Sequence, residues 1–475
     1  MGKVIILITI DCLRYDSLEY LLKSIPKSYG IKVYHNHYSN APYTWLSFPS
    51  IFTSTPPIFI ERGSVFKRMV ITQLLKRYLN KLITIGVNGG NPFLVKQRGY
   101  AKGFDHFIDL TDNNNDNQNL FRNLFKYGVK KIIDKFLSKH NPLRTLLAIL
   151  IQSYLVSIDY MVNANQQDKV ISLLFPCINI LNKNIDIDTN YFIWIHLMNL
   201  HTMGIFRMGH MKQYCGLLNS SLILARTYFR GTSGTFTDED VKETRNVYFK
   251  ELQLVSSTIN NLLRLLLEIL REHEVYIIIT SDHGEEFLEH GGWGHQGRAH
   301  YGIWITHLYD ELLHVPFIIA SPYFEKRIEH YYTITSHLDV LPTIMHLFLN
   351  SNIVRTIYRM IWGSSLLSLE HYCRIERESY DRARIVVAEA DAIVKPNLEG
   401  LGQAYAIIDK RYKYIWHPVL GEALFDRMRD PTEKVNLIDD LQDLANEYRR
   451  HMVKYLRTKR RRMLSYKAAL KILEL

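Results

Sequence analysis

A dense group of carboxylates and imidazoles follows one apolar run of the sequence. The run VYIIIT at residues 275–280 leads directly into SDHGEEFLEHGGWGH at residues 281–295. The chemically active side chains of this stretch are Asp282, His283, Glu285, Glu286, Glu289, His290 and His295. Carboxylates and imidazoles are common ligands of divalent metal ions and common acids and bases of catalysis. The stretch therefore indicates either half of a metal-dependent active site or a solvated charged loop.

Polar side chains of the same kinds stand at the ends of three other apolar runs. Asp11 follows residues 4–10, Asn88 and Asn91 stand at the end of the run 82–90, and His196 and His201 stand at the end of 191–197. In an open α/β sheet, ligands bind outside the carboxyl ends of the strands, so these groups are expected to converge there. Asp11 and Asp282 would repel one another unless a cation lay between them. The pattern therefore predicts a divalent metal ion.

The elements that must position these residues are strands and helices in alternation. The runs 4–10, 191–197 and 275–280 are continuously apolar, which is typical of strands covered on both faces of a parallel sheet. The runs 82–90 and 314–322 predict two further strands. Helical patterns at 66–82 and 237–274 lie between them, and the second begins with Thr237, Asp238 and Glu239, a suitable helix start. This alternation predicts a doubly wound α/β sheet.

Composition and the pattern of apolar and polar residues along the chain predict the domain organisation. The chain has 475 residues, of which 47% are hydrophobic, which excludes disorder for most of its length. We expect a catalytic α/β domain at 1–370 with a helical insertion at about 111–185, a small α+β subdomain at 371–445, and a basic helical tail at 446–475. Much of the net charge of +11 lies in this tail. The tail is interpreted either as a solvated helix or as a contact for a membrane surface; no specific nucleic-acid binding is predicted.

Cysteine usage and the apolar segments predict a reducing, cytoplasmic environment. The four cysteines, Cys12, Cys177, Cys215 and Cys373, form no CxxC pair, which excludes zinc-ribbon and thioredoxin-like proteins. A disulfide framework is not expected at this density. The first apolar run is too short for a signal peptide, and the longest apolar segment, 143–162, is interrupted by polar residues.

Five motifs, taken together, resemble the sulfatase family of the alkaline phosphatase superfamily. They are ITIDCLRYDSL at 8–18, IHLMNLH at 195–201, SDHGEEFLEHG at 281–291 with LYDELLHVPFII at 308–319, SHLDVLPTI at 336–344, and ALFDRMRDPTEKVNL at 423–437. The matches are collinear and span residues 4 to 437. The resemblance implies an alkaline-phosphatase-like fold: a doubly wound, mostly parallel sheet flanked by helices, with a small C-terminal antiparallel-sheet subdomain.

The segment that carries the nucleophile departs from the family pattern. The family has C/S-x-P-x-R there, and its Cys or Ser is oxidised to formylglycine. This chain reads SNAPYTWLSFPSIFTST at 39–55, which places Thr44 at the nucleophile position, with Leu46 and Phe48 in place of the Pro and Arg. Threonine cannot become formylglycine, so no formylglycine is expected. The stretch is similar to that of threonine-dependent phosphotransferases and phosphodiesterases; Ser47 is the alternative nucleophile.

The resemblance also implies a role for each site residue. The implied ligands of one divalent ion (Mn, Mg, Ca or Zn) are Asp11, Thr44, Asp282 and His283. The ion would activate the Thr44 hydroxyl and polarise the ester oxygen. His201 is the expected acid or base, and His196, His295 and His307 are expected to bind substrate.

Neighbouring residues are given structural interpretations. We expect Glu285, Glu286 and Glu289 to cap and solvate a helical turn after the strand. Lys413 is interpreted as a surface lysine, and Arg14 as pairing either with a carboxylate such as Asp16 or with an anion.

We therefore expect a metal-dependent ester hydrolase that cleaves phosphate monoesters or diesters, in preference to sulfate esters, through Thr44 and a covalent intermediate. Its substrate would be a small-molecule, lipid or glycan ester. Three different functions are also compatible with the sequence: a true sulfatase, a transferase that moves a phospho-alcohol group, and a non-catalytic family member that binds an anion.

Overall fold

The computed structural model of the chain describes residues 1–60, 64–65, 67–109, 111, 178–181, 186–201, 237–295, 297–300, 303–349, 361–368, 384–394 and 400–473. Most of the predicted insertion at 111–185, including the apolar segment 143–162, lies outside the described residues.

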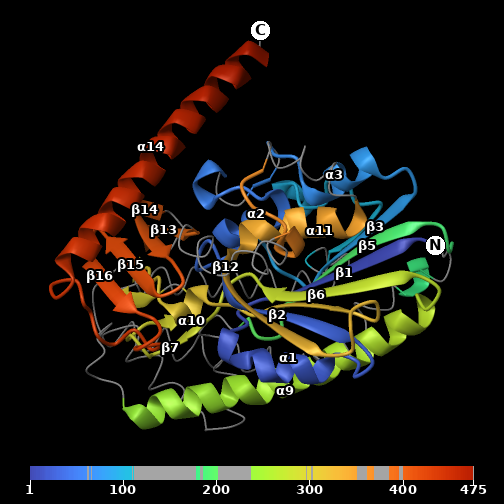
Figure 1. Ribbon diagram of the computed structural model, residues 1–475, viewed down its shortest axis with the longest axis horizontal. Coiled ribbons are helices and arrows are strands. Elements are labelled where there is room, and N and C mark those ends of the chain that lie inside the picture. Colours follow the sequence, from blue (N-terminus) through green and yellow to red (C-terminus); the bar gives the residue numbers. More distant parts are fainter. Residues whose placement is uncertain are drawn as a thin grey trace, which may run out of the picture.

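A central eight-stranded sheet organises the molecule (Figure 1), in the order β12-β2-β11-β6-β1-β5-β3-β4. Its strands are β1 (Lys3–Ile10), β2 (Gly30–Tyr38), β3 (Leu82–Asn88), β4 (His106–Asp109), β5 (Asn190–Leu197), β6 (Glu274–Ser281), β11 (Phe317–Ser321) and β12 (Ile328–Ser336). Strand β11 runs antiparallel to both of its neighbours, and the remaining pairs are parallel. The predicted, mostly parallel α/β sheet is confirmed.

Helices cover both faces of this sheet (Figure 1), which explains why its central strands are apolar throughout. One face carries α1 (Leu18–Ser24) and α9 (Asp238–Ile269), and the other carries α2 (Thr44–Thr53), α3 (Ile71–Tyr78) and α11 (Val340–Phe348). Successive residues of β1 point to opposite faces. Ile6 and Ile8 pack in the same core as Leu263 of α9, whereas Ile5 and Leu7 share a core with residues of α2 and α11.

A second, antiparallel sheet forms the C-terminal part. It has the order β16-β15-β14-β13-β10-β9. Its strands are β9 (Arg298–His300), β10 (Ile303–Ile305), β13 (Val386–Val394), β14 (Gly400–Ile408), β15 (Tyr412–His417) and β16 (Gly421–Asp426). The predicted C-terminal antiparallel sheet is thus confirmed, although β9 and β10 come from the segment assigned to the catalytic domain.

The C-terminal helix α14 (Gln442–Leu473) packs on this second sheet through its first turns and then extends away from it (Figure 1). Ala445 and Tyr448 contact the cluster of Ile407, Tyr414 and Leu424. Within the described part of the chain, no helix is both long enough and apolar enough to span a bilayer.

Candidate active site

The carboxyl ends of β1 and β6 bring the two predicted aspartates together. Strand β1 pairs in register with β5 and β6, so that Ile10 lies beside Leu197 and Ser281. The residues that follow, Asp11 and Asp282, therefore emerge at the same level of the sheet. Ser281 Oγ donates a hydrogen bond to the Ile10 carbonyl at 2.7 Å, which ties the two strand ends together.

Thr44, the first residue of α2, places its hydroxyl between these carboxylates. Its Oγ1 lies 2.8 Å from Asp282 Oδ2, 3.4 Å from Asp11 Oδ2 and 3.3 Å from His283 Nε2. His283 Nε2 is also 3.4 Å from Asp282 Oδ2 and 3.6 Å from Asp11 Oδ1. All four side chains are buried. We refer to Asp11, Thr44, Asp282 and His283, the metal ligands expected from the sequence, as the first metal site.

The spacing and charge of this group fit a divalent ion. Metal–ligand bonds of about 2.0–2.4 Å hold neighbouring ligand atoms roughly 3–3.5 Å apart, which agrees with the separations above. Among the described residues, no lysine or arginine forms an ion pair with Asp11 or Asp282. Burial and the charge of Asp11 together raise the pKa of Asp282 to about 7. Burial also opposes ionisation of Asp11, but the neighbouring imidazoles, His201 first, hold its pKa well below its ordinary value. A bound cation would let both carboxylates ionise.

Neighbouring side chains orient the ligands. His283 Nδ1 lies 2.8 Å from the Gly284 carbonyl; an Nδ1–H donor there leaves Nε2 free to bind a metal. Asn91 Nδ2 donates to Asp11 Oδ2 at 2.7 Å and lies 3.4 Å from Thr44 Oγ1. The sequence indicated Asn91 as a strand-end residue, but its contact with Asp11 could not be inferred from spacing alone.

His196 lies behind Asp11. It is fully buried, with Nε2 at 3.3 Å from Asp11 Oδ2 and Nδ1 at 2.9 Å from Thr9 Oγ1. Its ring packs between Phe48 and Trp194. The ring thus contacts Asp11 from a buried position, and the substrate-binding role expected of His196 stays a prediction.

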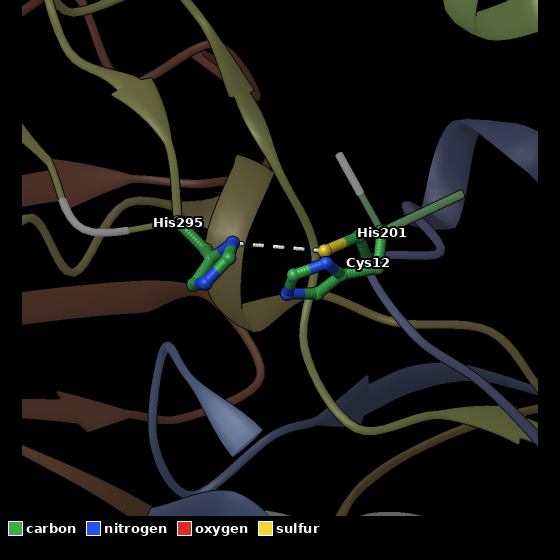
Figure 2. A group of neighbouring side chains, drawn as sticks. All are labelled: Cys12, His201 and His295. Carbon is green, nitrogen blue, oxygen red and sulfur yellow. Dashed lines mark hydrogen bonds between the residues drawn. The ribbon is translucent and has the colours of Figure 1, made fainter. Parts of the chain in front are cut away.

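His201 and His295 lie close to Cys12 (Figure 2). The His295 ring centroid is 5.2 Å from that of His201 and 4.6 Å from that of His283. His295 Nδ1 lies 3.6 Å from Cys12 Sγ and 3.4 Å from Glu285 Oε2. The structure thus brings two of the predicted histidines to the ligands, and their catalytic and substrate-binding roles stay predictions.

His307 has a different environment. Its Nδ1 lies 2.8 Å from Glu286 Oε2, and its ring meets Tyr309 edge-on. The structure therefore places His307 against Glu286, and the substrate-binding role expected of His307 stays a prediction.

The expected solvated helical turn at Glu285, Glu286 and Glu289 is wrong. This stretch forms the short strands β7 (Glu286–Phe287) and β8 (Trp293–Gly294), and both Glu285 and Glu286 are fully buried. Glu286 Oε1 accepts hydrogen bonds from the backbone amides of His290 and Gly292. Arg14 pairs with Asp16 and with Glu289, which matches the expected pairing of Arg14 with a carboxylate.

Lys413 is also not a surface residue. It is fully buried, and its Nζ lies 2.8 Å from Asp310 Oδ1 and 2.9 Å from Glu433 Oε1. Asp310 begins α10 (Asp310–Leu313), which follows the stretch containing β7 and β8. The ion pairs therefore anchor the second sheet to the segment that carries the site.

Comparison with known proteins places these features in a family. The family model described as Sulfatase matches residues 3–351. The uncharacterized sulfatase YidJ of Escherichia coli is 28% identical over 196 residues, which cover 41% of this chain and 34% of YidJ. The match thus spans about a third of the length of this relative.

Solved structures support the fold. A phosphonate monoester hydrolase of Agrobacterium radiobacter superposes with a TM-score of 0.59 at 15% identity, covering 95% of this chain and 94% of that chain. The 2-O GAG sulfatase BT1596 superposes with a TM-score of 0.58 at 15% identity, covering 96% and 92%. Because the family match extends over well more than half of the chain, the protein belongs to the sulfatase family.

Proposed function

We propose that this family member is a metal-dependent ester hydrolase in which Thr44 is the nucleophile and phosphoesters are the preferred substrates. The observation that carries the proposal is the place of Thr44 Oγ1, which lies within 3.4 Å of Asp11, Asp282 and His283. A threonine with a purely structural role would not need two buried carboxylates and an imidazole around its hydroxyl.

Asp11, Thr44, Asp282 and His283 would hold one divalent ion. Such an ion, when bound, lowers the pKa of a coordinated hydroxyl and polarises an ester oxygen. Thr44 also begins the ten-residue helix α2, whose N-terminus carries partial positive charge. An anionic phosphoryl group beside Thr44 is therefore favoured by the helix as well.

The residues support a two-step displacement. Thr44 Oγ1 forms a bond to phosphorus, the bond from phosphorus to the leaving oxygen breaks, and Asp282 Oδ2 is placed to accept the hydroxyl proton. His201 donates a proton to the leaving oxygen. Water then attacks phosphorus with loss of a proton to His201, the bond to Oγ1 breaks, and Thr44 regains its proton. An alcohol in place of that water would give transfer instead of hydrolysis.

Threonine favours phosphorus over sulfur for a chemical reason. A hydrated formylglycine has a second hydroxyl that can expel the sulfate from the covalent intermediate. Thr44 has only one, so its ester must be cleaved by an external nucleophile at the central atom. The fold is shared by a phosphonate monoester hydrolase and a GAG sulfatase, so a sulfated glycan is the second candidate substrate class.

Substitution of Thr44 tests the proposal. With Mn²⁺ or Zn²⁺ bound, Thr44→Ala should lower turnover of an aryl phosphodiester by a factor on the order of 10³ or more, while metal content measured by mass spectrometry stays within about twofold. Ser47→Ala is the matched control, because Ser47 lies one turn along α2 and its Oγ donates a hydrogen bond to the Thr44 carbonyl at 3.5 Å and, within the described part of the chain, to no metal-ligand side chain. Loss of activity in Ser47→Ala but not in Thr44→Ala would move the nucleophile to Ser47.

The choice of substrate distinguishes a phosphoesterase from a sulfatase and from a non-catalytic protein. The protein should be assayed with aryl phosphate, phosphodiester, phosphonate and sulfate esters, before and after treatment with EDTA. Turnover of sulfate alone would identify a sulfatase. Absence of turnover with every ester and metal, in a protein that still binds phosphate, would identify a non-catalytic protein that binds anions.

The tail supports a further part of the proposal, namely that the ester is presented at a membrane surface. Arg450, Lys454 and Arg457 are exposed on α14, which extends beyond the second sheet (Figure 1). Co-sedimentation with vesicles that contain anionic lipid, compared with neutral vesicles, tests this contact, and a chain ending at residue 445 is the control.

A further inference from the structure

Cys12, His201 and His295 form a group of their own beside the first metal site; we call it the cysteine–histidine cluster. Cys12 follows β1, His201 follows β5 and His295 follows β8, so three separate elements bring the side chains together. Their ligand atoms all lie within 4.8 Å of one another. Figure 2 shows the three side chains turned toward a common point.

The separation of Cys12 from His295 is that of two ligands of one zinc ion. Zinc binds thiolate sulfur at about 2.3 Å and imidazole nitrogen at about 2.0–2.1 Å, usually with tetrahedral geometry. Two such ligands are then roughly 3.6 Å apart. The separation of Cys12 Sγ from His295 Nδ1 is 3.6 Å. Glu285 Oε2, 3.4 Å from the same nitrogen, provides a nearby carboxylate.

The electrostatic surroundings favour a cation here. Asp11, Asp282 and Glu285 are fully buried around the Cys12 thiol. A divalent ion at the first metal site balances the charges of the two aspartates and leaves the negative field of Glu285 beside the cluster. Positive charge is therefore favoured at the cluster, and a thiolate with two imidazoles is a soft ligand set suited to zinc.

The backbone of Cys12 is strained in a way that turns its side chain into the site. Its φ is +60°, a conformation that costs a residue other than glycine about 1 kcal/mol or more. Tyr248 Oη donates a hydrogen bond to the Cys12 carbonyl at 2.9 Å, and the Arg14 amide donates to Tyr248 Oη at 3.0 Å. These bonds hold the turn, as is common where strain serves a functional site.

We infer that Cys12, His201 and His295 bind a second metal ion, preferably Zn²⁺, so that the active site is a pair of unlike sites: an oxygen-rich first site and a thiolate–imidazole second site. This rests on the proposed function for the first ion. The Cys12 thiol would lose its proton to solvent on binding. Binding of an ion would replace both proton-transfer roles that the proposed mechanism gives His201: the leaving oxygen would take its proton from water, and the attacking water of the second step would release its proton to solvent.

Cobalt substitution tests this directly, because a thiolate bound to Co²⁺ gives a charge-transfer band that oxygen and imidazole ligands do not. The full chain should be stripped of metal, reloaded with Co²⁺, and measured for metal content and absorption. We expect two equivalents of metal and a thiolate band. His295→Ala should lose one equivalent and the band, whereas Asp282→Asn should lose one equivalent and keep the band.

Two further variants show whether a loss of metal or of the thiolate band is specific to the ligands or results from misfolding. His201→Ala removes a half-buried ligand and should reproduce the effect of His295→Ala. His451→Ala, on α14, should change neither quantity.

The contrary outcomes separate the two proposals. Cys12 Sγ also lies within reach of Asp11 and His283. One result would assign Cys12 to the first metal site and refute the proposed second site. In that result the protein binds one equivalent of metal, and the thiolate band disappears in Asp282→Asn but persists in His295→Ala. One equivalent without any thiolate band would also overturn the second site and leave the first intact. Absence of bound metal altogether would contradict the proposed function as well.

Discussion

Replacement of Glu286 by glutamine measures how much the charge of this carboxylate contributes to stability. Glu286 holds the β7–β8 segment next to the active site. Glu286 is fully buried; Oε2 faces His307 Nδ1 at 2.8 Å, and Oε1 accepts the amides of His290 at 2.9 Å and Gly292 at 2.8 Å. Glutamine keeps a carbonyl oxygen for the two amides and has nearly the same volume. The substitution therefore removes mainly the negative charge that faces His307.

The pKa of Glu286 gives the size of the stabilisation that its charge contributes to the folded state. Burial alone would raise this pKa, but His307 and the other donors hold it at about 2, below its ordinary value of 4.5. At about 1.4 kcal/mol for each pKa unit, the difference corresponds to about 3 kcal/mol. Because the pKa is lowered in the folded state, this stabilisation is present above pH 4.5 and is lost as the pH falls toward 2. By pH 3 about 2 kcal/mol of it should be gone.

Urea unfolding followed by tryptophan fluorescence at pH 7, 5 and 3 measures this effect. Glu286→Gln should lower the free energy of unfolding by about 3 kcal/mol at pH 7 and by about 1 kcal/mol at pH 3. Glu325→Gln, at a residue whose side chain is 72% exposed, is the control and should change it by less than about 0.5 kcal/mol. A deficit that stays constant from pH 7 to pH 3 would refute the reasoning, since lost packing and not lost charge would then explain it.

Two other substitutions test the surroundings of the site. Lys413→Met leaves Asp310 and Glu433 buried without their ammonium partner, so the free energy of unfolding should fall by about 3–5 kcal/mol in the same urea assay, with exposed Lys326→Met unchanged as the control. An equal loss in both variants would contradict a specific role for the buried ion pairs. Asn91→Ala removes the donor to Asp11 Oδ2 and should weaken metal binding by about tenfold to a hundredfold in calorimetric titration, whereas Asn260→Ala on α9 should not. Unchanged affinity would show that Asn91 does not orient the ligand.

The central strands could be predicted because strands that are buried on both faces consist almost entirely of apolar residues. Runs 4–10, 191–197 and 275–280 are apolar on both sides, and they became β1, β5 and β6 at the middle of the sheet. Strands β2 and β12 lie toward one edge, mix polar with apolar residues, and were not predicted. The helix expected over 66–82 is limited to α3, since the apolar pattern does not specify where a helix ends.

The predictability of the site residues depends on where their partners lie. Asp11 and Asp282 could be paired from sequence because parallel strands end at one edge of a sheet. Thr44 required the family resemblance, since it begins a helix and follows no apolar strand of the predicted set. The burial of Glu286 and Lys413 could not be foreseen, because charged residues are usually exposed and their partners lie 21 and 103 residues away.

Positions 12 and 44 together decide which metal and which chemistry the site can support. Cys12, directly after Asp11, offers sulfur and no further oxygen ligand beside the first metal site. Calcium takes six to eight oxygens in proteins, whereas the remaining set offers two carboxylates, one hydroxyl and one imidazole. Zinc and manganese accept this smaller, mixed set more readily. On the proposed function, a thiol at position 12 in place of an oxygen ligand favours an ion that strongly activates a hydroxyl, and Thr44 supplies the hydroxyl that needs such activation.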